Sequence, residues 1–64
     1  MIIVRGVVVS HRLTKKGKNL YVLALANGNL VKVITSKALE LLKPVELSSQ
    51  VYVANDNQLI LILD

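Results

Sequence analysis

The 64-residue chain contains no cysteine, tryptophan or phenylalanine, and only one histidine, His11. The missing cysteines exclude disulfides and thiolate metal sites, and a lone histidine does not make a metal site, so we expect neither a metal nor a cofactor. The sequence also lacks a recognisable set of nucleophile, base and acid, a phosphate-binding loop, and paired carboxylates in a basic region. We therefore do not expect an enzyme.

Long apolar segments are also missing. No uncharged apolar run approaches the roughly 20 residues of a transmembrane helix, and the first residues lack the pattern of a signal peptide. We therefore expect a cytoplasmic protein without a membrane partner, folded as one domain over residues 1–64. Hydrophobic residues make up 53% of the chain, which is more than one small core hides and favours a homodimer.

Positive charge is concentrated in the first half of the chain. The net charge is +4, and residues 1–32 hold six basic and no acidic residues, whereas residues 33–64 hold two basic and four acidic ones. Such an imbalance favours a polyanionic partner, most often nucleic acid. Most of the cations lie in or near a segment around Gly17, which we expect to be a flexible loop that stands away from the body. The candidate phosphate contacts are Arg5, Arg12, Lys15, Lys16, Lys18 and Lys32.

Two β-prone runs, residues 20–26 and 30–35, flank the dipeptide Asn27-Gly28. This dipeptide is the strongest short signal for a hairpin with a type I′ turn, because both residues tolerate a positive φ. Residues 2–10 form another β-prone run, in which Gly6 indicates a bulge or bend. We therefore expect three consecutive strands, the first of them curved.

The second half of the chain changes its pattern. Leucines at helical spacing in residues 36–43 predict a short helix with Ser36 as its N-cap, and Pro44 ends it. Residues 50–54 and 59–63 are predicted strands, joined by a turn over residues 55–58. The last strand has no polar face, so we expect it to form the homodimer contact.

Three strands, a short helix and two strands is an order that resembles the OB-fold, whose members often bind oligonucleotides. The expected fold is therefore an all-β, five-stranded OB-like barrel with one short helix between strands three and four. A fold does not fix a function by itself, so the residues must decide.

The first half of the chain resembles the filamentous-phage type of single-stranded DNA-binding protein, small dimeric barrels with a basic hairpin wing. The matching residues are Met1-Ile2 with Val4, Lys16-Gly17-Lys18 with Tyr21, and Leu30-Val31-Lys32-Val33 with Thr35. The resemblance implies a homodimer that coats single-stranded DNA or RNA without sequence preference, in replication or protection of single strands.

Tyr21 and Tyr52 are the only tyrosines. A base stacked on an aromatic ring contributes about 1–3 kcal/mol, so a nonspecific strand binder usually keeps such a ring. Tyr21 adjoins the basic segment and is the favoured platform. The expected nucleic-acid contacts are thus Arg5, Arg12, Lys15, Lys16, Lys18, Tyr21 and Lys32.

Two other functions stay open. Gly6-Val7-Val8-Val9-Ser10 and Val33-Ile34-Thr35 resemble segments of the molybdate-binding barrels of the molbindin type, which implies an oxyanion site. Where that family favours a Lys-Ala-Ser or Lys-Ala-Thr triplet, however, this chain has Asp56-Asn57-Gln58, and a carboxylate there repels molybdate. The remaining alternative is a protein-interaction barrel without a nucleic-acid ligand.

Overall fold

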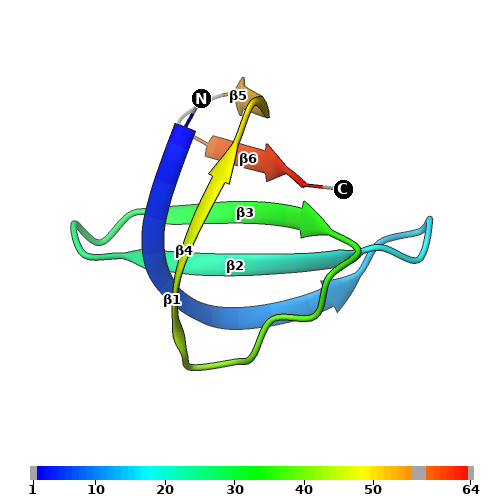
Figure 1. Ribbon diagram of the computed structural model, residues 1–64, viewed down its shortest axis with the longest axis horizontal. Coiled ribbons are helices and arrows are strands. Elements are labelled where there is room, and N and C mark those ends of the chain that lie inside the picture. Colours follow the sequence, from blue (N-terminus) through cyan, green and yellow to red (C-terminus); the bar gives the residue numbers. More distant parts are fainter. Residues whose placement is uncertain (1, 56–57, 64) are drawn as a thin grey trace.

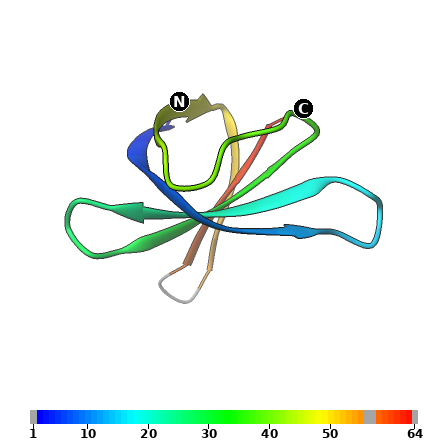
Figure 2. The same ribbon diagram turned by 90° about the horizontal axis from the view of Figure 1, so that it is seen from below.

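The computed structural model describes residues 2–55 and 58–63, and these form six β-strands in one sheet (Figure 1). The strands are β1 (Ile2–Leu13), β2 (Asn19–Leu25), β3 (Leu30–Thr35), β4 (Pro44–Ser49), β5 (Val51–Asn55) and β6 (Gln58–Ile62). The sheet curls into a half-barrel, as Figures 1 and 2 show. The all-β prediction is confirmed. In the described part of the chain, no helix is long and apolar enough to cross a membrane.

The strands lie in the order β4-β1-β2-β3-β6-β5. Two hairpins join β1, β2 and β3, and β4 returns through a longer connection to pair antiparallel with the first half of β1. This arrangement of four strands is a Greek key. β6 pairs parallel with β3 and antiparallel with β5. The Greek key therefore forms most of the curled sheet, and the β5–β6 pair extends it beyond β3.

β1 is curved because it belongs to two strand pairs. Its residues from Ile2 to Val7 pair with β4, and those from Gly6 onward pair with β2, with a register shift between Val8 and Ser10. A Cβ atom at Gly6 would lie 2.6 Å from the backbone oxygen of Ala24. The predicted curvature is present, and Gly6 permits the close approach of the two strands, whereas the bulge lies after Val8.

The β1–β2 and β2–β3 hairpins, which together form a three-stranded meander, close with the same kind of turn. Thr14 N–H donates to the Lys18 oxygen (2.8 Å) and Gly17 N–H to the Thr14 oxygen (3.0 Å), and residues 25–29 repeat both hydrogen bonds at 2.9 and 3.0 Å. The glycines, Gly17 and Gly28, have φ values of 82° and 87°. This is a type I turn followed by a left-handed glycine. The predicted hairpin at Asn27-Gly28 is thus present, but its turn is not type I′, because Asn27 does not have a positive φ.

The core lies on the inner face of the curled sheet. Val8, Leu23, Val33 and Leu61 are fully buried there, and they come from four different strands. Alternate residues of each strand point inward, so the predicted apolar runs place every second side chain in the core. The remaining buried hydrophobic residues are Val4, Tyr21 and Val31.

The predicted helix is wrong: residues 36–43 form an irregular connection with a turn at Leu41 and Leu42. Its backbone N–H groups have partners outside a helix. Lys37 N–H donates to Thr35 Oγ1 (3.1 Å), and Leu42 N–H donates to the Val8 oxygen (2.7 Å). Starting a helix is costly in so short a segment. Contacts with β1 and β3 therefore override the helical spacing of the leucines.

The strand count is six rather than five because Pro44–Ser49 forms β4, which the sequence analysis missed. Only Gln50 separates β4 from β5, so the predicted strand at residues 50–54 is the second part of a longer, bent segment. The predicted strand at residues 59–63 corresponds to β6. The predicted turn includes Asp56 and Asn57, which lie outside the described residues.

Candidate nucleic-acid interface

The β1–β2 hairpin projects from the half-barrel and carries three lysines around its turn (Figure 1). Lys15, Lys16 and Lys18 are all exposed. The turn is compact rather than a long flexible loop, because β1 continues to Leu13 and β2 begins at Asn19. A third hydrogen bond, from Lys18 N–H to Thr14 Oγ1 (3.1 Å), also closes it. The structure therefore presents the three charges on a short, internally bonded tip.

Arg12 and Lys32 lie on the outer face of the sheet. Lys32 stands between two buried valines of β3, so its side chain points outward. Arg12 pairs with Leu20, the neighbour of the buried Tyr21, and therefore points outward as well. β2 lies between their strands, which puts the two backbones about 10 Å apart in the direction across the strands. Both cations thus face the same side of the β1–β2–β3 meander.

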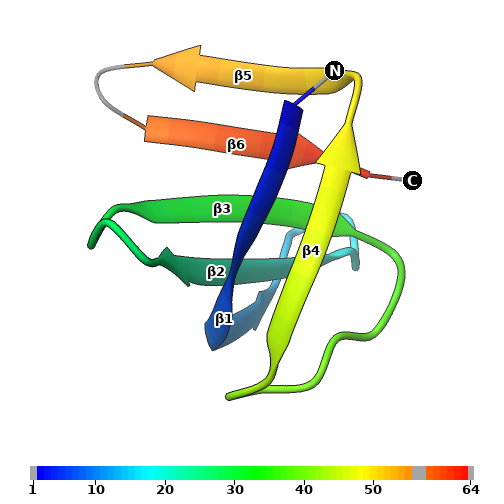
Figure 3. The same cartoon turned by 60° about the vertical axis from the view of Figure 1, so that its left-hand side comes forward.

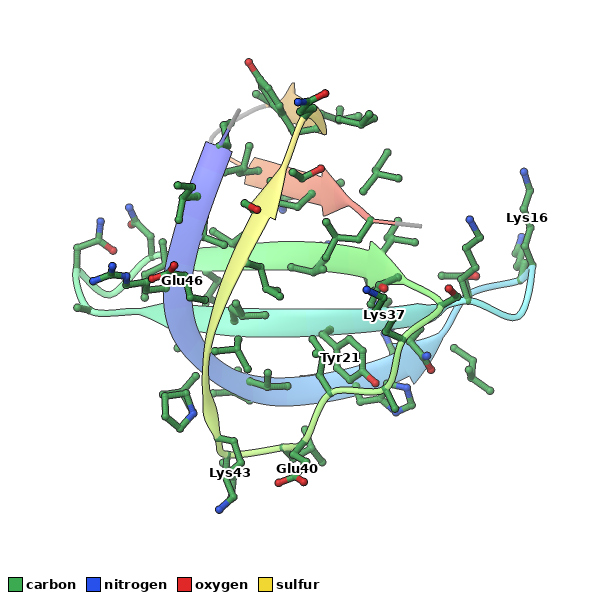
Figure 4. The ribbon with its side chains drawn as sticks, viewed as in Figure 1. Lys16, Tyr21, Lys37, Glu40, Lys43 and Glu46 are labelled. Atoms are coloured by element: carbon green, nitrogen blue, oxygen red, sulfur yellow. The ribbon has the colours of Figure 1, made fainter. Side chains whose placement is uncertain are left out.

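Arg5 does not belong to this cluster. Its Nε donates a hydrogen bond to Glu46 Oε2, which makes an exposed ion pair between β1 and β4. In Figure 4, Glu46 and the hairpin residue Lys16 are at opposite sides of the molecule. The structure therefore places Arg5, a predicted phosphate contact, away from the hairpin and pairs it with a carboxylate.

Tyr21 is a core residue. Its side chain is only 3% exposed, and its hydroxyl accepts a hydrogen bond from Leu39 N–H (2.8 Å). The exposed His11 lies against it, with ring centroids 4.8 Å apart. The expectation that Tyr21 offers a stacking surface is therefore wrong in this structure, because the ring is covered. Tyr52 is 47% exposed, but it lies on β5, apart from the basic hairpin.

A small polar network holds the residue 36–43 connection beside the hairpin. Asn19 Nδ2 donates to the Lys37 oxygen (3.2 Å), and Asn19 Oδ1 lies 2.8 Å from His11 Nε2. The exposed Lys37 is thereby placed near the start of β2, as Figure 4 shows. Lys37 was not among the predicted contacts, because it falls in the predicted helix. Its positive charge, two residues after the end of β3, was the available signal.

The carboxylates with described positions lie away from the hairpin tip. Glu46 is paired with Arg5, and Glu40 projects from the residue 36–43 connection on the same side as Lys43 (Figure 4). No acidic residue precedes Glu40 in the sequence, so the β1–β2–β3 meander carries none. The field around the hairpin is therefore positive and is not offset by carboxylates on its own strands. We call the set Arg12, Lys15, Lys16, Lys18, Lys32 and Lys37 the basic cluster.

Comparisons with models of protein families, with curated proteins and with solved structures found no match to this chain. The chemistry of the site is therefore inferred from the residues of this chain alone. Exposed lysine and arginine side chains can neutralise phosphates, and the neighbouring outer face of the meander is apolar, with Leu20, Val22 and Ile34 half-buried.

Proposed function

We propose that the protein binds single-stranded nucleic acid without sequence preference and acts in replication or protection of single strands. The basic cluster contacts the phosphates, and the apolar outer face of the meander lies against sugars and bases. DNA is the favoured ligand, and RNA carries the same phosphate chemistry. The proposal rests on the gathering of the basic cluster on one hairpin and the strands beside it.

We also infer that the half-barrel is an OB-like barrel with a divided fourth strand. If β4 and β5 count as one strand bent at Gln50, the chain has five strands in a Greek-key barrel. In OB-folds the face of strands two and three and the loop between strands one and two bind oligonucleotides. Apart from Lys37, the basic cluster lies on the meander and its β1–β2 turn, which supports the proposed function.

The test is a salt titration of binding to fluorescent oligo-dT, with duplex DNA of equal length as the competing ligand. If about four phosphates are neutralised, the log-log slope is near −3, which is about 50-fold between 50 and 200 mM salt. Replacing Lys15, Lys16 and Lys18 together by alanine is expected to flatten the slope by about two units. It is also expected to weaken oligo-dT and mixed-sequence strands alike, because phosphate contacts carry no base information.

A charge-matched pair of double variants separates the cluster from net charge alone. Lys16→Ala with Lys18→Ala, and Arg5→Ala with Lys43→Ala, both lower the net charge by two. Only the first pair is expected to flatten the slope, by about 1.4 units. Equal losses in the two double variants mean that any surface cation serves, and unchanged binding in the lysine triple variant refutes the site.

The protein-interaction and molybdate alternatives give different outcomes. A protein-interaction barrel shows no salt-dependent binding to single strands, and its apolar surface on β5 would then carry the function. A molybdate carrier gives a saturable heat of binding with sodium molybdate in a calorimetric titration. Neither outcome is expected from the basic cluster.

A further inference from the structure

The two end strands of the sheet differ in how their free edges are protected. β4 and β5 each pair with one neighbour only. An exposed edge strand tends to pair with another chain unless proline, charge or a bulge prevents it. β4 begins with Pro44 and carries Glu46. β5, with the sequence Val-Tyr-Val-Ala-Asn, contains neither a proline nor a charged residue.

The side chains of residues 51–54 in β5 are also exposed. Val51 is 58% exposed, and Tyr52 and Val53 are each 47% exposed. Figure 3 shows β5 along the top of the molecule with β6 below it, so the other side of β5 is the outer edge of the sheet. The sheet thus has an unprotected apolar edge at β5 and a protected edge at β4.

The strand expected to make the dimer, residues 59–63, has no free edge. β6 lies between β3 and β5, and Leu61 at its centre is fully buried. Strand pairing between copies must therefore use a different element. In the described chain, β5 is the apolar strand with an unpaired edge, and Ser49 Oγ bonds only its first residue there, to the Val51 oxygen (2.7 Å) and N–H (3.1 Å).

We propose that β5 pairs antiparallel with β5 of a second copy, around a two-fold axis at Val53, and that the protein is a homodimer. In this register Val53 faces Val53 of the partner subunit, and Tyr52 faces Ala54 of the partner subunit. A strand that pairs with itself brings identical residues together at the axis, so a charge there is excluded. The uncharged sequence of β5 meets this requirement, and the sequence of β4, with Pro44 and Glu46, suits pairing less well.

The pairing makes the two sheets continuous. A two-fold axis that relates antiparallel neighbours stands perpendicular to the sheet, so both outer faces lie on the same side. Val53 pairs with Ile60, and Ile60 pairs with Lys32. Each subunit therefore has a cross-strand row of Lys32, Ile60 and Val53, and the two rows meet at the axis. The dimer itself does not depend on nucleic-acid binding and is tested without nucleic acid.

The absence of cysteine from the chain allows a clean crosslinking test. Directly opposed residues in antiparallel strands have Cα atoms about 4.5–5.5 Å apart, within the range of about 4.4–6.8 Å that a disulfide spans. Val53→Cys is expected to form a disulfide-linked dimer under mild oxidation. Ser48→Cys, which places an exposed thiol on β4, is the control and is expected to stay largely uncrosslinked.

Light scattering of the cysteine-free protein gives the second readout. The expected mass is about twice the 7.0 kDa of the chain. Val53→Lys puts like charges at the axis and is expected to give a monomer with unchanged far-ultraviolet circular dichroism, whereas Val53→Thr and Ser48→Lys remain dimers. A monomeric parent protein, a dimer that survives Val53→Lys, or equal crosslinking of the two cysteine variants overturns the proposal.

Discussion

The backbone N–H of Leu39 donates a hydrogen bond to Tyr21 Oη across 2.8 Å, which joins the connection after β3 to the middle of β2. The bond explains two departures from the sequence-based expectations. It engages the Leu39 N–H, which the Ser36 N-cap side chain would accept in the predicted helix, and it anchors the tyrosine that was expected to stack on bases. One hydrogen bond between distant residues thus contributes both to the irregular path of residues 36–43 and to the burial of Tyr21.

Tyr21→Phe is expected to lower the free energy of unfolding by about 1–2 kcal/mol, because it leaves the Leu39 N–H without its acceptor. Binding to single strands is expected to stay unchanged, since the ring remains in the core. Urea denaturation measures the first quantity and the oligo-dT titration the second. Tyr52→Phe, at the half-exposed position on β5, is the matched control and is expected to cost less than about 0.5 kcal/mol. A loss of binding without a loss of stability would mean that the Tyr21 hydroxyl contacts the bound strand, because phenylalanine keeps the ring.

Leu42→Gly is expected to stabilise the protein by about 0.5–1 kcal/mol. Leu42 has a φ of 62°, the only positive φ of a non-glycine residue in the described chain, and its side chain is 76% exposed. A left-handed conformation costs an L-residue roughly 1–2 kcal/mol, and glycine avoids this cost. Glycine also loses more conformational entropy on folding, which offsets part of the gain in stability. Little buried surface is lost.

The neighbouring Leu41→Gly is the control for that effect. Leu41 is also exposed but does not have a positive φ, so glycine there only adds unfolded-state entropy and is expected to destabilise by about 0.5–1 kcal/mol. Opposite signs for the two variants in thermal unfolding confirm the strain at Leu42. Two losses of similar size would show that the leucine side chain at 42 contributes packing that outweighs its backbone strain.

Local patterns predicted the strands whose residues alternate or are continuously apolar. The β2–β3 hairpin follows from Asn27-Gly28, and the curved β1 from Gly6, because turn chemistry and side-chain period act over a few residues. The turn type was wrong: Asn27 accepts a hydrogen bond from Asn29 N–H instead of adopting a positive φ. A turn with one left-handed glycine fits the same two residues.

β4 was missed although its signal is present. Val45 and Leu47 alternate with exposed residues, a period of two, but the leucines before Pro44 favoured a helix that stops at the proline. For the candidate site, the charge pattern predicted the lysines of the hairpin. It could not show that Arg5 pairs with Glu46, 41 residues away, since only the β1–β4 register brings them together.

Gly6→Asn is expected to destabilise the protein by about 3 kcal/mol, because any side chain at this position meets the Ala24 carbonyl and forces β1 and β2 apart. Gly17→Asn is the matched control. Gly17 has open space around its Cβ position and only a left-handed backbone to maintain, which asparagine tolerates. Its expected cost is below about 1 kcal/mol. Similar urea midpoints for the two variants would contradict the close approach at Gly6.

Arg5→Gln and Arg12→Gln remove one identical charge from the same strand, and we expect them to differ in nucleic-acid binding. Arg12 lies on the outer face at the hairpin, so its loss is expected to flatten the log-log salt slope by about 0.7. Arg5 is paired with Glu46 at the other side of the molecule, so its loss should leave the slope unchanged. Because the Arg5–Glu46 pair is exposed, it is also expected to change stability by less than about 1 kcal/mol. If both variants flatten the slope equally, bound strands reach the β1–β4 side as well, and the site then has to include Arg5.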